Sequence, residues 1–159
     1  MPNYTYEKVA MVDAEFVDYW FKQGNDEKAM EIYRTLTTRA PGEVMYATSG
    51  NTLLRILLKH GKKYEAWALF FEDISSYDSE TINMMVNECF EMGKFKEAMD
   101  TFKLGDSFAP CYRNIIDRFC ERGMMCEAED LFDKMWSHEG LVLSYEVATM
   151  IRGCSSTLK

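Results

Sequence analysis

The sequence predicts an all-α fold, a helical-repeat solenoid of antiparallel helix pairs, with about four repeats and a partial fifth. The first observation is a glycine followed five residues later by alanine and nine residues later by an aromatic residue, a pattern that recurs every 30 to 37 residues. The second is an amphipathic stretch before each glycine, and the third is the scarcity of proline, with three in 159 residues. The pattern consists of Gly24, Ala29 and Tyr33; Gly61, Ala66 and Phe70; Gly93, Ala98 and Phe102; and Gly123, Ala128 and Phe132.

Each unit is expected to be a first helix, a glycine turn and a second helix. Residues 51–60, 83–92 and 114–122 place apolar residues at i, i+1, i+4 and i+5, which forms one stripe on a helix. The glycine then ends the first helix, because it tolerates the left-handed conformation that a helix C-terminus often needs. In the first unit we expect helices at 11–23 and 26–38. The alanine lets the paired helices approach, and the aromatic residue lies on the same face one turn later.

The predicted repeats span 10–46, 47–78, 79–108 and 109–143, and residues 144–159 form the partial fifth. That last segment contains one helix-like stretch, 145–153, with no partner helix after it. Its Val147, Met150 and Ile151 would form an uncovered apolar face. We therefore expect a segment of a longer array, with a surface for a protein partner or for self-association through this C-terminal helix.

Composition excludes several classes of protein. The five cysteines contain no C-x-x-C pair and only two histidines accompany them, so neither a metal site nor a cofactor is expected. No nucleotide-binding glycine motif and no deaminase signature occurs, which predicts a protein that is not an enzyme. No apolar run reaches the roughly 18 residues of a membrane helix, and the N-terminus does not resemble a secretory signal. No membrane partner is expected.

The charge distribution argues against a strong polyanion binder. The formal net charge is −8, whereas nucleic-acid-binding proteins usually present a basic face. Only the second unit balances its acidic groups, through Arg55, Lys59, Lys62 and Lys63.

A large aliphatic residue stands seven positions before each turn glycine, where tetratricopeptide repeats have a small one. These residues are Val17, Leu54, Val86 and Ile116. Together with the stretches NTLLRILLKHGKKYEAWALF and RNIIDRFCERGMMCEAEDLFDKM, they make nearly the whole chain resemble a pentatricopeptide repeat (PPR) protein of the P type. The alternative is a peptide-binding tetratricopeptide array, since DYWFKQGNDEKAMEIY fits either family.

The PPR resemblance implies a right-handed superhelix whose first helices line a groove. It also implies a location in the mitochondrion or the chloroplast, with no transit peptide in this sequence. The default ligand is single-stranded RNA, read at one base per repeat.

The resemblance assigns roles to particular positions of each repeat. The fifth and last residues meet the base edge, the second residue sandwiches the base, and a basic residue two before the glycine faces phosphate. The candidate RNA-binding residues at these positions are Asn51, Asp78, Asn83, Thr48, Lys22 and Lys59. Asn51 and Asp78 form the one polar pair, which the family links to uridine, but helix capping explains both residues equally well.

The other repeats lack this chemistry. Asn83 is paired with Phe108, and Glu91 and Glu121 occupy the phosphate position of the third and fourth repeats. Apolar or aromatic residues stand at the groove edge instead, namely Tyr46, Phe108 and Leu143, and exposed apolar side chains suit a protein partner. We therefore expect an adaptor that binds other PPR or RNA-processing proteins, as accessory proteins of RNA editing do. Sequence-directed binding of single-stranded RNA is the alternative.

Overall fold

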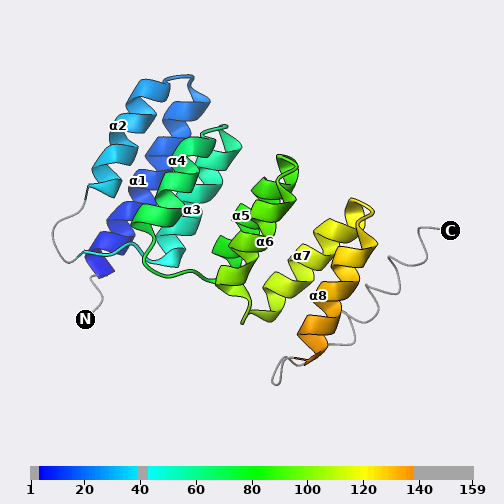
Figure 1. Cartoon of the computed structure of the whole chain (residues 1–159). Coiled ribbons are helices and arrows are strands. Elements are labelled where there is room, and N and C mark those ends of the chain that lie inside the picture. Colours follow the sequence, from blue (N-terminus) through cyan, green and yellow to red (C-terminus); the bar gives the residue numbers. More distant parts are fainter. Residues whose placement is uncertain (1–3, 39–42, 138–159) are drawn as a thin grey trace. The chain divides into compact units, whose positions relative to one another are not determined.

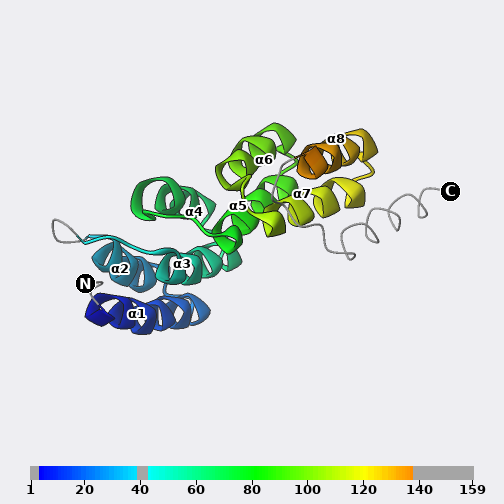
Figure 2. The ribbon, with the colours of Figure 1, turned by 90° about the horizontal axis from the view of Figure 1, so that it is seen from below.

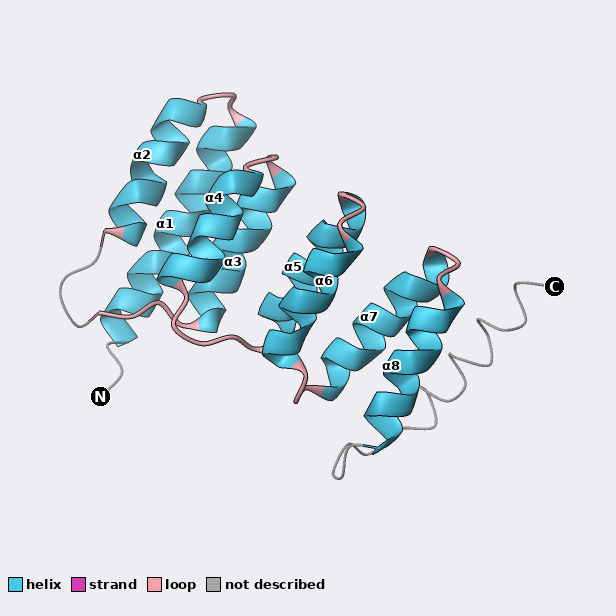
Figure 3. Ribbon diagram, viewed as in Figure 1, coloured by secondary structure: helices cyan, strands magenta, loops and turns pink. Residues whose placement is uncertain are grey.

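A computed structural model describes residues 4–38 and 43–137 of the chain, and every regular element in these two stretches is a helix (Figures 1 and 3). The chain divides into two compact units between Thr81 and Ile82. The all-α helical-repeat fold predicted from the sequence is confirmed, because within each unit the helices follow one another as antiparallel pairs joined by short turns. The predicted partial fifth repeat, 144–159, lies outside the described residues.

The first unit begins with the pair α1 (Tyr4–Lys22) and α2 (Asp26–Thr37). The helix α1 starts seven residues before residue 11, where the sequence predicts its beginning. The earlier start is explained by Lys8, Ala10 and Met11, which favour a helix, and by the absence of a helix-breaking residue between Tyr4 and Lys8. Its buried face holds Ala10 and Ala14, both 1% exposed, so that α2 and the next helix can approach closely.

The second pair of this unit is α3 (Ala47–Lys59) and α4 (Lys63–Ala68), which continues as a π-helical turn, η1 (Leu69–Asp73). The wider turn is closed by the Ile74 amide, which donates to the Leu69 carbonyl over 3.1 Å. Ile74 then forms a parallel bridge with Met45 and covers the α3 backbone at Gly50, where an added Cβ would lie 2.7 Å from Ile74 Cδ1.

The second unit contains most of α5 (Ser79–Glu91), then α6 (Phe95–Phe102), a 3₁₀ turn η2 (Lys103–Gly105), α7 (Ala109–Glu121) and α8 (Met125–Ser137). Figure 2 shows α5 and α7 in one layer of this unit and α6 and α8 in the other. Edge-to-face ring pairs join the layers and the neighbouring helices: Phe90 with Phe119, and Phe102 with Tyr112, have centroids 4.9 and 4.8 Å apart.

All four turn glycines adopt the predicted left-handed conformation, with φ between 67° and 72°. At Gly61, the amide donates to the Leu58 carbonyl over 3.1 Å, and the next amide, of Lys62, donates to the Leu57 carbonyl over 2.8 Å. The same two bonds recur at the other three turns, as in the Schellman motif that satisfies the last carbonyls of a helix. The four alanines that follow are 3% exposed or less, which confirms their packing role.

The large residues seven positions before each glycine are also buried, at 1% exposure or less. They are therefore part of the core, as expected for large aliphatic residues on the apolar face of a helix. Among the described residues, no helix is both long and apolar enough to span a bilayer.

Candidate binding surface

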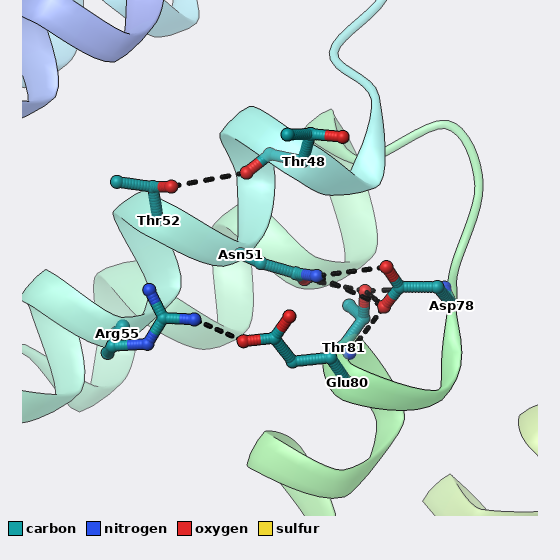
Figure 4. A network of polar contacts seen from close by, with 7 residues as sticks. All are labelled: Thr48, Asn51, Thr52, Arg55, Asp78, Glu80 and Thr81. Carbon is teal, nitrogen blue, oxygen red and sulfur yellow. Dashed lines mark hydrogen bonds and ion pairs between the residues drawn. The ribbon is translucent and has the colours of Figure 1, made fainter.

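The structure brings together the polar pair that the sequence singled out. Asn51 lies in the second turn of α3, and its side-chain amide donates to Asp78 Oδ1 over 3.0 Å and to Asp78 Oδ2 over 3.2 Å (Figure 4). On its other side, Asn51 Oδ1 accepts a hydrogen bond of 2.6 Å from the Thr81 hydroxyl. Asn51 is 3% exposed, so both ends of its amide group are satisfied inside the protein.

Asp78 also begins the next helix. Its Oδ1 accepts from the Thr81 amide over 2.8 Å, and its own amide lies 3.4 Å from the Thr81 hydroxyl, which is the reciprocal arrangement of a capping box. Burial alone would raise the pKa of Asp78, but the hydrogen bonds from Thr81 and Asn51 outweigh it and hold the pKa below its usual value. The pair therefore fixes the start of α5 against α3, while the Asp78 residue itself remains exposed.

The two lysines expected at phosphate positions meet a carboxylate instead. Lys22 Nζ lies 2.5 Å from Asp18 Oδ2, and Lys59 Nζ lies 3.4 Å from Asp18 Oδ1. His60 Nε2 lies 2.7 Å from the same Oδ1, and its ring stacks on Phe21 with centroids 4.8 Å apart. One carboxylate thus joins the ends of α1 and α3.

The surroundings of Asp18 set its protonation. The residue is 8% exposed, and this burial would raise the pKa, but hydrogen bonds from Lys22, His60 and Lys59 together lower the pKa of Asp18 from 3.8 to about 2. Asp18 is therefore charged across the physiological range and balances part of the positive charge of both lysines.

Two further polar contacts surround Asn51. Arg55 on α3 forms an exposed ion pair with Glu80 on the first turn of α5, so the negative charge of Glu80 is balanced within the unit. Thr48, at the predicted base-sandwiching position, is exposed, and its carbonyl accepts from the Thr52 hydroxyl over 3.2 Å. Thr48 is thus accessible to a ligand.

The second unit offers less for RNA. Asn83 is half-buried, its amide nitrogen lies 3.5 Å from the Pro110 carbonyl oxygen, and its Oδ1 has no hydrogen-bond partner among the described residues. Glu91 and Glu121 are exposed at the ends of α5 and α7, and Glu121 pairs with Arg118 over 2.9 Å. The predicted phosphate positions of this unit are therefore negatively charged, as the sequence indicates.

The predicted protein-binding residues are described only in part. Tyr46, 41% exposed, directly precedes α3, and the half-buried Phe108 directly precedes α7. The remaining candidates lie outside the described residues: Leu143, Val147, Met150 and Ile151.

Sequence reasoning missed Asp18, which contacts Lys22 and Lys59, and His60, which contacts Asp18. Their contact spans 42 positions of the chain, and no local pattern joins them. The one available signal was an acidic residue on the apolar face of the first helix, directly after Val17. Within the described stretches, no group of three or more acidic, histidine or cysteine side chains could hold a metal ion.

These features define a helical-repeat protein with two polar networks in its first unit. One joins α3 to the start of α5, and the other surrounds Asp18 at the ends of α1 and α3. The PPR repeat family model matches residues 80–104 and 110–139. The mitochondrial pentatricopeptide repeat-containing protein At3g60980 of Arabidopsis thaliana is 44% identical over 138 residues, covering 79% of this chain and 32% of that protein. A second Arabidopsis pentatricopeptide repeat-containing protein, At1g10270, is 46% identical over 84 residues, covering 42% of this chain and 9% of that protein.

The chain therefore contains pentatricopeptide repeats and is homologous to plant pentatricopeptide repeat-containing proteins. The match favours this family over the tetratricopeptide alternative. The chain spans about a third of the length of one curated relative and under a tenth of the other.

Proposed function

We propose that this chain is a non-catalytic binding module of organellar RNA metabolism that acts chiefly as a protein-interaction adaptor in RNA processing or editing. The PPR family and the mitochondrial name of one relative support the organellar setting. The observation that carries the adaptor role is that Lys22 and Lys59, the cations at the predicted phosphate positions, both contact Asp18.

The other residues expected to contact RNA are also poorly suited to bind it, because they either bond within the protein or carry a negative charge. Asn51 and Asp78 bond to each other and to Thr81, and Glu91 and Glu121 would repel a phosphate backbone. Tight binding of a single strand needs several phosphate contacts and several stacked bases, each base contributing about 1–3 kcal/mol. One repeat of this kind supports only about millimolar affinity.

The first experiment titrates the chain with a U-rich single-stranded RNA at low and at physiological salt. We expect weak binding that disappears at physiological salt, because only screened charge contacts would hold the RNA. Tight binding that persists at the higher salt concentration would contradict the adaptor proposal.

A second experiment seeks the protein partner in mitochondrial and chloroplast extracts from plants. The replacement Phe108→Asp should remove partners that the unaltered chain retains at high salt. Leu104→Asp is the matched control, because Leu104 is 50% exposed on the neighbouring turn η2 and does not stand at a predicted groove-edge position. A partner that the Phe108→Asp variant retains would place the interaction elsewhere, and equal losses with both variants would mean that the effect is not specific to Phe108.

The second candidate function is sequence-directed binding of single-stranded RNA with a preference for uridine. It is favoured by the placement of Asn51 and Asp78 side by side, with the exposed Thr48 one turn before Asn51. Under this function, Asn51→Ala should abolish the preference for U-rich over A-rich strands at low salt, and an unchanged preference would exclude it.

A further inference from the structure

The outermost helix of the first unit, α1, presents a second apolar face that the unit leaves uncovered. Val9, Val12, Phe16 and Tyr19 are each between 50% and 57% exposed. The core face of α1, by contrast, is formed by residues that are 6% exposed or less: Ala10, Ala14, Val17 and Phe21. At 100° per residue the two sets lie on opposite sides of the helix. A contiguous exposed apolar stripe of this kind marks an interaction surface.

The spacing of this stripe selects a helix as its partner. The four residues follow one another at intervals of three, four and three positions, which is the a–d–a–d pattern of a two-stranded coiled coil. In this register Val9 and Phe16 are a positions, and Val12 and Tyr19 are d positions. Such a seam buries its side chains between those of a second helix that runs alongside.

The charges beside the seam indicate a second copy of the same helix. Lys8 occupies the g position before Val9, and Asp13 occupies the e position after Val12. Among the described residues neither side chain has an ion-pair partner. In a parallel pair, the g residue of one helix meets the e residue five positions later in its partner, so each Lys8 would face the Asp13 of the other copy, twice about the two-fold axis.

We propose that the chain forms a parallel homodimer through the exposed face of α1. Figure 2 shows α1 at the edge of the first unit, with α2 and α3 on its other side, so a second helix can lie along it without displacing either. The contact is self-complementary, as a two-fold interface requires. It is distinct from the groove positions and from the C-terminal segment, and it does not depend on the proposed function.

Sedimentation equilibrium of the whole chain across the micromolar range tests the dimer. We expect a reversible species of twice the 18.5 kDa monomer mass. Val12→Asp and Phe16→Asp should each raise the dissociation constant at least about tenfold. Val12→Gln should also raise the dissociation constant, and it does so without placing a charge on the helix. Tyr64→Asp is the control: Tyr64 is 83% exposed on α4, and its replacement should leave the dissociation constant unchanged. Circular dichroism verifies that each variant keeps its helix content.

A charge exchange tests the parallel orientation. Lys8→Glu should weaken the dimer about threefold to tenfold, because it places like charges opposite Asp13, and adding Asp13→Lys should restore it. A chain that stays monomeric throughout, or a dimer that Val12→Asp does not weaken, overturns the proposal. A dimer that depends on Val12 but is not restored by the double exchange overturns the parallel pairing.

Discussion

The four turn glycines show how a single residue type fixes the period of this fold. At Gly61 the backbone has φ +71°, and no atom lies within 4 Å of the place where a Cβ would be. Glycine is therefore required at this turn by backbone conformation rather than by lack of space. In the left-handed region an L-residue costs about 1–2 kcal/mol, and asparagine tolerates it better than alanine.

We expect Gly61→Ala to lower the free energy of unfolding by about 1–2 kcal/mol and Gly61→Asn to lower it by less. Urea unfolding followed by circular dichroism measures both. Because the surroundings are open, the order of the two variants reports the backbone conformation alone. An alanine variant as stable as the unaltered chain would show that the turn does not need the left-handed conformation.

Asp18 makes the first unit less stable in acid. Its pKa falls from 3.8 to about 2 in the folded chain, so the folded state favours the charged form, and the stabilisation is present above about pH 4 and lost as the pH falls towards 2. A shift of this size corresponds to about 2 kcal/mol. We expect Asp18→Asn to destabilise the chain by about this amount at neutral pH.

Unfolding measured at a series of pH values checks this prediction. The difference between the Asp18→Asn variant and the unaltered chain should shrink as the pH approaches 2, since the carboxyl group is then protonated in nearly all unfolded chains and in about half of the folded ones. Glu31→Gln, at an exposed position of α2, serves as the control and should change the curve little. A difference that is constant from neutral to acidic pH would argue that the charge of Asp18 is irrelevant.

Between elements, α3 lies in close contact with Ile74, the residue that follows η1. An added Cβ at Gly50 would lie 2.7 and 2.8 Å from Ile74 Cδ1 and Cγ1. Alanine would raise the helix propensity of α3 by up to about 1 kcal/mol, but overpacking costs about 1–3 kcal/mol. We expect Gly50→Ala to be destabilising overall, as measured by urea unfolding.

A double-mutant cycle isolates this contact. Ile74→Val removes the nearest atom, Cδ1, and by itself costs about 0.5–1.5 kcal/mol. Combined with Gly50→Ala it should cost less than the sum of the two single changes, because the shorter side chain relieves the clash. Additive costs would mean that Gly50 is not required for the approach of Ile74.

The helix pairs and their turns could be predicted because their signals are local. Each turn needs one glycine, and each pair needs an alanine and an aromatic residue at fixed offsets. The π-helical turn η1 could not be predicted, since the Phe70–Phe71 sequence within it fits an α-helix equally well, and the bridge from Ile74 to Met45 closes across 29 positions. The family register assigned Asn51 and Asp78 to the same base, but it did not predict that they would bond to each other or that Thr81 would close the network between them.

Across the whole molecule, the placement of charge matters more than its sum. The net charge of −8 does not exclude RNA binding, because a basic groove can exist on an acidic protein. In the first unit, however, Lys22 and Lys59, which were expected at phosphate positions, share the carboxylate of Asp18. In the second unit, the corresponding positions carry the exposed Glu91 and Glu121. The expected phosphate positions of the described repeats therefore carry either a lysine that contacts a carboxylate or a carboxylate itself.

This distribution predicts that RNA affinity can be gained by two substitutions. If Glu91 and Glu121 stand at phosphate positions, Glu91→Lys combined with Glu121→Lys should add two phosphate contacts. Affinity for a U-rich single strand should rise, and the slope of log K against log salt should steepen by about 0.7 per contact, or about 1.4 for both. Titrations at several salt concentrations measure the affinity and the slope together.

The matched control is Glu127→Lys combined with Glu129→Lys, two exposed positions of α8. Both double variants change the net charge equally, so a purely global effect of charge would raise RNA affinity in both alike. A gain confined to the first pair would support the assignment of the groove register, because only its positions face the strand. Equal gains, or none, would show that α5 and α7 do not present their C-terminal ends to RNA, and would leave protein binding as the function of this surface.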